Sequence, residues 1–117
     1  MFTKNQILNW IFEEGAAEIL LNWAEEISFT PSPNENVLNF VMVISDREDD
    51  DAVYVIRPET IRKGIRVGFE NRKTLGDPYQ QQVFTDLQFG KWDDVDYDAF
   101  TADYLIQFAL FGEVRYS

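Results

Sequence analysis

One stretch of the sequence decides the fold: Asp98-Ala99-Phe100-Thr101-Ala102-Asp103-Tyr104-Leu105-Ile106-Gln107-Phe108-Ala109-Leu110-Phe111-Gly112. Large apolar side chains recur in it at helical spacing, and further apolar residues fill the gaps, so the helix is apolar almost all round. Such a helix is buried inside a domain, because each of its faces needs an apolar neighbour. We expect Asp98 or Thr101 to begin the helix and Gly112 to end it. The other elements should pack around it.

Two helices are predicted upstream of this stretch. Pro58 and Glu59 favour a helix over about residues 59–71, because proline suits the first helical turn and a carboxylate suits the positive end of the helix dipole. Gly64 and Gly68 lie four residues apart on this helix and indicate close packing by another element. The next helix should run over residues 78–88, with Asp77 as its cap and Gly90 at its end.

The N-terminal segment predicts two short helices. Thr3-Lys4-Asn5-Gln6 has the spacing of a capping box, so a helix should cover about residues 4–14. The apolar residues on the two sides of Gly15 would point in nearly opposite directions on one continuous helix. A break at Gly15 resolves this conflict, and we expect a second helix over about residues 16–27.

Strands are predicted where short runs are apolar and β-branched. Val37 to Ile44 and Ala52 to Ile56 fit this description and should form a hairpin. Alternation from Val114 to Tyr116 indicates a short terminal strand. The fold class is therefore α+β: a single acidic domain over residues 1–117, with four to five helices packed on a short, mostly antiparallel sheet.

The composition excludes several kinds of ligand. The chain has 117 residues and a formal net charge of −11, which disfavours direct binding of nucleic acid or of an anionic membrane surface. It contains no cysteine and no histidine, so disulfides and zinc sites are not expected. No signal peptide or membrane-spanning run is evident, and a cytoplasmic location is expected.

Two acidic clusters are the candidate binding sites. The first is Asp46-Arg47-Glu48-Asp49-Asp50-Asp51, at the expected tip of the hairpin, and the second is Asp93-Asp94-Val95-Asp96-Tyr97-Asp98, before the last helix. Trp92 lies beside the second cluster and could anchor a partner rich in arginine. The residues expected to bind a partner are Asp46, Glu48, Asp49, Asp50, Asp51, Trp92, Asp93, Asp94 and Asp96.

Neither cluster predicts a metal site or a catalytic site. Asp94-Val95-Asp96-Tyr97-Asp98 opens like a calcium loop, but Ala99 and Leu105 stand where that loop needs glycine and glutamate. Histidine and cysteine nucleophile arrangements are excluded by composition. A glycosidase-like pair would need one carboxylate with a raised pKa, for which Asp103 is the better candidate. We expect no cofactor, no metal and no enzymatic activity.

The basic residues are concentrated in one part of the sequence. Five of the ten fall on or just after the helix predicted over residues 59–71, namely Arg62, Lys63, Arg66, Arg72 and Lys73. This basic face can be solvated and paired with local carboxylates, or it can bind an acidic partner or phosphate. It can also meet the acidic hairpin tip of a second copy across a homodimer.

The C-terminal residues 101–116 resemble the end of a group of small bacteriophage and prophage proteins, which carry a Gln-x-x-Leu-Phe-Gly-Glu-x-x-Tyr pattern. Pro58-Glu59-Thr60-Ile61-Arg62-Lys63-Gly64 is similar to the middle motif of that group, and Glu14-Gly15 with Trp23 resembles its N-terminal segment. Ser117 stands where the group has glycine. The resemblance implies a phage or prophage origin, and it assigns no functional residue.

These observations predict an interaction protein. The leading hypothesis is a phage-encoded protein that binds the basic surface of a host or defence protein and imitates the charge of nucleic acid. The second is a self-associating structural or accessory protein whose acidity aids solubility. The third is a carboxylate enzyme, which would need two acids about 5–10 Å apart in a pocket.

Overall fold

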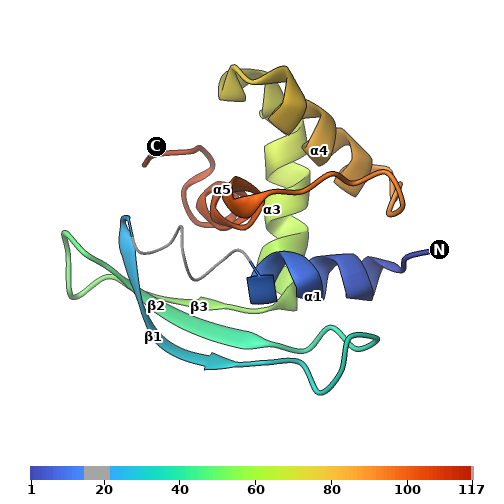
Figure 1. Cartoon of the computed structure of the whole chain (residues 1–117). Coiled ribbons are helices and arrows are strands. Elements are labelled where there is room, and N and C mark those ends of the chain that lie inside the picture. Colours follow the sequence, from blue (N-terminus) through green and yellow to red (C-terminus); the bar gives the residue numbers. More distant parts are fainter. Residues whose placement is uncertain (15–21, 117) are drawn as a thin grey trace.

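The computed structural model of the chain describes residues 1–14 and 22–116. They form four α-helices, one short 3-10 helix and one three-stranded sheet (Figure 1). In chain order the elements are α1 (Lys4–Glu14), β1 (Ala24–Thr30), β2 (Val41–Asp46), β3 (Val53–Ile56), α3 (Pro58–Glu70), η1 (Arg72–Leu75), α4 (Pro78–Gln88) and α5 (Ala99–Phe111). The predicted single α+β domain with an antiparallel sheet is confirmed.

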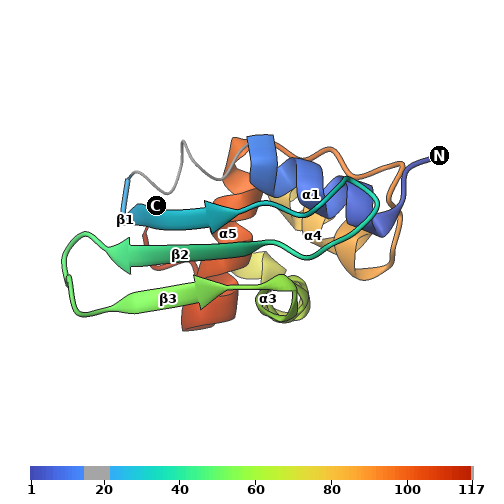
Figure 2. The same cartoon turned by 90° about the horizontal axis from the view of Figure 1, so that it is seen from below.

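The molecule has two layers. The sheet is an antiparallel meander in the order β1-β2-β3, and the helices cover one of its faces (Figure 2). Met42 and Ile44 of β2 are buried beneath the helices, whereas Val41 and Val43 alternate with them on the outer face. This period of two is what a sheet covered on one side requires.

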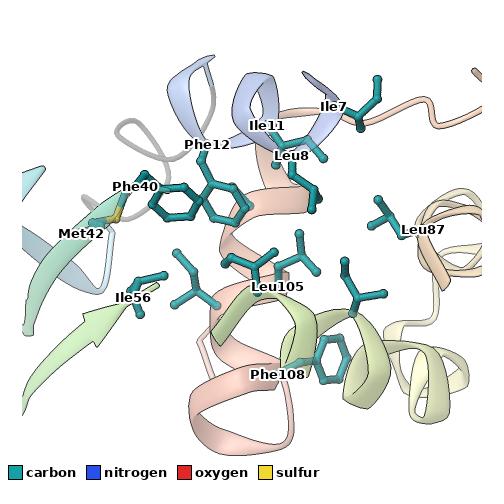
Figure 3. Packing of buried hydrophobic residues seen from close by; sticks show 14 of the residues in the cluster. Ile7, Leu8, Ile11, Phe12, Phe40, Met42, Ile56, Leu87, Leu105 and Phe108 are labelled. Carbon is teal, nitrogen blue, oxygen red and sulfur yellow. The ribbon is translucent and has the colours of Figure 1, made fainter. Parts of the chain in front are cut away.

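Helix α5 lies at the centre of the helical layer, as its apolar composition predicts. Leu105, Ile106 and Phe108 are fully buried in it, and Figure 3 shows Leu105 and Phe108 among side chains from other elements. Above the sheet, Phe12 of α1 stacks on Phe40, with ring centroids 5.1 Å apart. Burial of large side chains of this kind stabilises a fold by about 1.5–3 kcal/mol each.

Helix α3 packs closely against its neighbours at two glycines, against α5 at Gly64 and against α4 at Gly68, which confirms the packing role expected for them. A Cβ atom on Gly64 would lie 2.3 Å from the backbone oxygen of Leu105, and one on Gly68 would lie 2.2 Å from the ring of Phe84 in α4. Neither position has room for a larger side chain.

The ends of the helices were predicted well. Thr3 and Gln6 form the expected capping box, with hydrogen bonds of 3.1 and 3.2 Å between each backbone nitrogen and the other side chain. Asp77 caps α4 by accepting from the backbone of Tyr79. Asp98 caps α5, and the Thr101 hydroxyl completes a capping box.

The helix predicted over residues 16–27 is wrong from Asn22 onward, because residues 22 and 23 form a turn and the chain forms β1 from Ala24. Residues 16–21 of this prediction and the break at Gly15 lie outside the described residues. The apolar spacing of residues 23, 24 and 27 imitates a helix because a bulge between Glu26 and Ser28 interrupts the alternation of the strand. The first hairpin strand also begins later than predicted, at Val41.

The terminal strand predicted from Val114 to Tyr116 is absent. The side chain of Gln107 occupies the hydrogen-bonding groups of Tyr116 instead. Its Oε1 accepts from the backbone nitrogen of Tyr116 at 2.7 Å, and its Nε2 donates to the backbone oxygen at 2.8 Å. The amide therefore replaces the strand neighbour that this segment would otherwise need.

No helix in the described residues has both the length and the apolar composition to cross a bilayer.

Replacing Gly64 with alanine should destabilise the protein, although alanine is the better helix former. Its Cβ atom meets backbone rather than a movable side chain, so α3 and α5 must separate. We expect the free energy of unfolding, measured in urea, to fall by about 2 kcal/mol or more. Arg66→Ala, on the exposed face of the same helix, is the control and should change stability little. Equal stability of Gly64→Ala and the unmodified protein would contradict the close approach.

Candidate functional site

The first acidic cluster forms the turn between β2 and β3, as predicted, and it projects beyond the helical layer (Figure 2). Backbone hydrogen bonds from Asp49 to Asp46 and from Ala52 to Asp49 shape this turn. The Asp49 carboxylate also accepts from the backbone nitrogen of Asp51 at 3.1 Å. We call the exposed residues 47–51 the acidic tip.

Asp46 does not belong to the exposed part of this cluster, which corrects the expectation that it faces a partner. It is 5% exposed. One carboxylate oxygen accepts from the backbone nitrogen of Glu48 at 2.9 Å, and the other accepts from the Tyr116 hydroxyl at 3.0 Å. Burial beside two donors makes Asp46 a structural residue that joins the turn to the C-terminal segment.

The side chains of the acidic tip remain available to an external partner. Glu48, Asp50 and Asp51 are exposed and form no hydrogen bond or ion pair through their side chains with other described residues. The exposed pair Arg62 and Glu59, 3.8 Å apart, is the one ion pair in the described part of the chain. No described cation forms an ion pair with the tip, so Arg47 within the tip itself is the nearest compensation of its negative charge along the chain.

The second acidic cluster lies in the loop between α4 and α5. Asp93 accepts from the backbone nitrogen of Phe2, and Asp94 and Asp96 are exposed. The backbone oxygen of Asp96 accepts from the Tyr79 hydroxyl at 2.7 Å. A hydrogen bond with Asp96, followed by desolvation and the charges of nearby carboxylates, raises the pKa of Tyr79 to about 12. Part of this cluster is thus committed to holding the loop.

Trp92 lies beside this loop but is half-buried and packs against the core. The two acidic clusters lie at opposite ends of the molecule in both views (Figures 1 and 2). One compact partner surface cannot cover both of them through a single continuous patch. The nine residues predicted to bind a partner therefore divide into two separate groups.

A buried polar network lies beside the start of the turn between β2 and β3. Asp103, on the buried helix α5, accepts at one oxygen from the indole nitrogen of Trp23 at 2.6 Å and from Gln107 at 3.0 Å. Trp23 in turn stacks on Tyr116, with ring centroids 5.3 Å apart and planes within 9°. These contacts bring together the start of β1, the centre of α5 and the C-terminal segment.

A pocket of about 400 Å³ opens beside this network. Its aromatic walls are Trp23, Phe100, Tyr104 and Tyr116, and its charged residues are Arg47, Glu48, Asp103 and Arg115. A volume of a few hundred Å³ with apolar walls and a few polar groups is typical of small-ligand sites, which span about 300–1,000 Å³.

Burial raises the pKa of the Asp103 carboxyl above its usual value, and the hydrogen bonds from Trp23 and Gln107 oppose this shift only in part. The hydrogen bond to Asp46 raises the pKa of the Tyr116 hydroxyl. Asp103 was expected to be the perturbed acid of this chain, and its environment has that effect. The acidic clusters, by contrast, supply no group of three acidic side chains arranged to hold a metal ion within the described residues.

Known proteins place no constraint on the hairpin or on the pocket. Comparisons of the chain with protein-family models, with curated proteins and with solved structures found no match. No cofactor, substrate or partner comes to these residues from a relative, so their chemistry rests on the contacts described above.

The basic residues are more dispersed than predicted. Arg62, Lys63 and Arg66 are exposed on α3, but the helix ends at Glu70. Arg72 therefore lies in η1, where its guanidinium donates to the backbone of Phe69 at 2.8 Å and covers the Phe69 ring. The basic face thus consists of three side chains on α3.

The pocket was not predicted from the sequence, because its lining comes from four separate segments. One signal for it was available. Asp103 and Gln107 are polar residues one helical turn apart in a helix that is otherwise apolar and buried, so they require buried partners. Their partners, Trp23 and Tyr116, lie 80 and 9 residues away along the chain.

Asp103→Asn should change how stability depends on pH. Because burial raises the pKa of the folded carboxyl, the folded protein binds more protons than the unfolded chain, whose aspartate has a pKa of about 4. The stabilising contribution of Asp103 is present below about pH 4 and is lost as the pH rises through the folded pKa.

The free energy of unfolding of the unmodified protein, measured relative to that of Asp103→Asn, should therefore fall between about pH 4 and the folded pKa. Above the folded pKa this difference should no longer change with pH. The loss is about 1.4 kcal/mol for each unit by which the folded pKa is raised. Urea denaturation from about pH 4 to pH 8 measures it. The exposed Asp94→Asn is the control, and a constant difference between Asp103→Asn and the unmodified protein would contradict the expectation.

Proposed function

We propose that the protein is an acidic interaction protein that binds the basic surface of another protein through its acidic tip. The observation that carries this proposal is the charge of the tip, which projects from the molecule with no ion pair to other described residues. Carboxylates held in this way attract a basic surface over long range and raise the rate of encounter.

The turn is also suited to binding because it is shaped before a partner arrives. Backbone hydrogen bonds close it at Asp46 and Ala52, and Asp49 accepts from Asp51. A preformed loop loses less conformational entropy on binding than a disordered one does. The partner therefore meets several carboxylates that extend from a backbone of defined shape.

The partner proposed is a host or defence protein that normally binds nucleic acid, in the host cytoplasm, with the protein itself encoded by a phage. A row of carboxylates on a projecting turn can imitate the phosphates of nucleic acid in charge. The net charge of −11 supports imitation of nucleic acid, because a strongly negative protein is repelled by nucleic acid and does not bind it directly. The resemblance of residues 101–116 to phage proteins supports the origin.

Neutralising the acidic tip should remove this binding. We compare Asp49→Asn/Asp50→Asn/Asp51→Asn with a control that removes the same charge elsewhere, Glu13→Gln/Glu70→Gln/Glu113→Gln, since these three glutamates are exposed. Affinity capture from a bacterial lysate, with quantification of the basic proteins retained, should show a loss of at least about tenfold for the tip variant alone.

Salt separates charge-driven binding from other contacts. At about 1 M ionic strength the Debye length is about 3 Å, so the interaction should be largely lost. Equal capture by the tip variant and the control variant would show that the tip is not the site. An affinity that does not change with salt would exclude the charge-driven version.

Self-association is the second candidate, and the outer face of the sheet favours it. Val53 and Val55 are 51% and 46% exposed there, and Ile27 of β1 is 58% exposed. Val55 lies directly opposite Val43 in the sheet, so apolar side chains are neighbours on its outer face. Figure 2 shows that the helices lie on the other face of the sheet. Patches of this kind mark interaction sites in many proteins.

Sedimentation equilibrium tests the second candidate. If two copies pack through this face, the unmodified protein should be a dimer, and Val53→Thr/Val55→Thr should shift it to the monomer. Threonine keeps the β-branched shape that suits a strand, so the fold is retained. A monomer at all concentrations would exclude self-association.

A further inference from the structure

The pocket beside the turn between β2 and β3 is lined by charged residues of both signs, and these residues form no ion pair with one another. On the acidic side, Asp103 uses one oxygen for Trp23 and Gln107. Its other oxygen, Oδ2, accepts no hydrogen bond from the described residues. The residue is 5% exposed and belongs to the lining of the pocket.

Two guanidinium groups belong to the same pocket. Arg47 comes from the acidic tip and Arg115 from the C-terminal segment. Neither forms an ion pair with a carboxylate of the described residues. Arg115 lies over the ring of Phe111 at 4.2 Å, and a hydrogen bond with Tyr116 also involves its guanidinium; the remaining donors of this planar group can still meet a carboxylate.

We propose that this pocket binds a small zwitterion, the ammonium and carboxylate of a free α-amino acid. The ammonium would donate to Asp103 Oδ2, and the carboxylate would accept from Arg47 and Arg115. Each charge of the ligand then meets an opposite charge that forms no ion pair within the described residues. Hydrogen bonds between charged partners are about twice as strong as neutral ones.

The walls indicate the kind of side chain that the amino acid carries. Phe100 and Tyr104 are stacked with centroids 6.0 Å apart, and Trp23 and Tyr116 form the second aromatic pair. An apolar or aromatic side chain would contact these rings without losing hydrogen bonds. The pocket has about 400 Å³ of space, which is within the range of small-ligand sites.

This inference does not depend on binding of a protein at the acidic tip. The zwitterion uses Asp103 and the aromatic walls, whereas the proposed partner uses the carboxylates of residues 49–51. The two sites share only the neighbourhood of Arg47 and Glu48. The tip variant should therefore bind the amino acid as the unmodified protein does, so failure of one proposal is distinguishable from failure of the other.

Titration with L-phenylalanine tests the inference. In a nitrogen-15 spectrum the indole signal of Trp23, identified by Trp23→Phe, should shift, whereas that of Trp10 should not. Calorimetry should show that L-phenylalaninamide, which lacks the carboxylate, and N-acetyl-L-phenylalanine, which lacks the ammonium, each bind at least about tenfold more weakly. The amide also resembles the N-terminal residue of a peptide, because it keeps the ammonium and has an amide in place of the carboxylate.

Variants of the pocket provide the second arm. Asp103→Asn and Arg47→Gln should each weaken binding of L-phenylalanine by at least about tenfold. Arg66→Gln, an exposed arginine on α3 outside the pocket, should leave binding unchanged. Arg47 is also exposed, so its variant tests the site even if Asp103→Asn does not fold.

Three results would overturn the inference. One is the absence of any Trp23 shift at millimolar L-phenylalanine. Another is binding of the amide as tight as that of the free amino acid, which would show that the pocket recognises the ammonium and side chain without the carboxylate, as at the N-terminus of a peptide. The third is equal weakening by Arg66→Gln and Arg47→Gln, which would place the ligand outside the pocket.

Discussion

The close approach of α3 and α5 is the constraint on which the rest of the structure depends. At Gly64 the two helices meet with backbone against backbone, and at Gly68 the ring of Phe84 fills the space that a side chain would need. The contact holds α5 inside the helical layer, with the sheet on one side and α4 on the other. Because α5 is buried, any polar residue that it carries must find its partners inside the protein.

Asp103 and Gln107 meet this requirement through hydrogen bonds to residues from other segments of the chain. Asp103 binds the indole of Trp23, and Gln107 binds the backbone of Tyr116. Tyr116 continues the connection to Asp46 at the end of β2. The polar groups that α5 buries are therefore the same groups that attach the hairpin and the C-terminal segment to the helical layer, and the pocket lies where these segments meet.

The sequence predicted the features that are decided within a few residues. Asp77, Asp98 and Gly112 were identified as helix ends because a cap needs only its own turn. Strand β1 was missed because a bulge displaced its apolar residues toward helical spacing. Asp46 could not be separated from its acidic neighbours, since only the distant Tyr116 distinguishes it. The pocket likewise depends on tertiary contacts that local patterns do not contain.

Tyr116 has one further consequence. Its ring is a wall of the pocket, and its hydroxyl holds the carboxylate at which the hairpin turn begins. A ligand that moved this ring on entering the pocket would therefore also act on the hydrogen bond to Asp46, at the start of the turn. Linkage is reciprocal: whatever binds at one place and favours a position of this tyrosine changes the affinity at the other by the same factor. The hairpin turn and the pocket therefore share Tyr116 as a common contact.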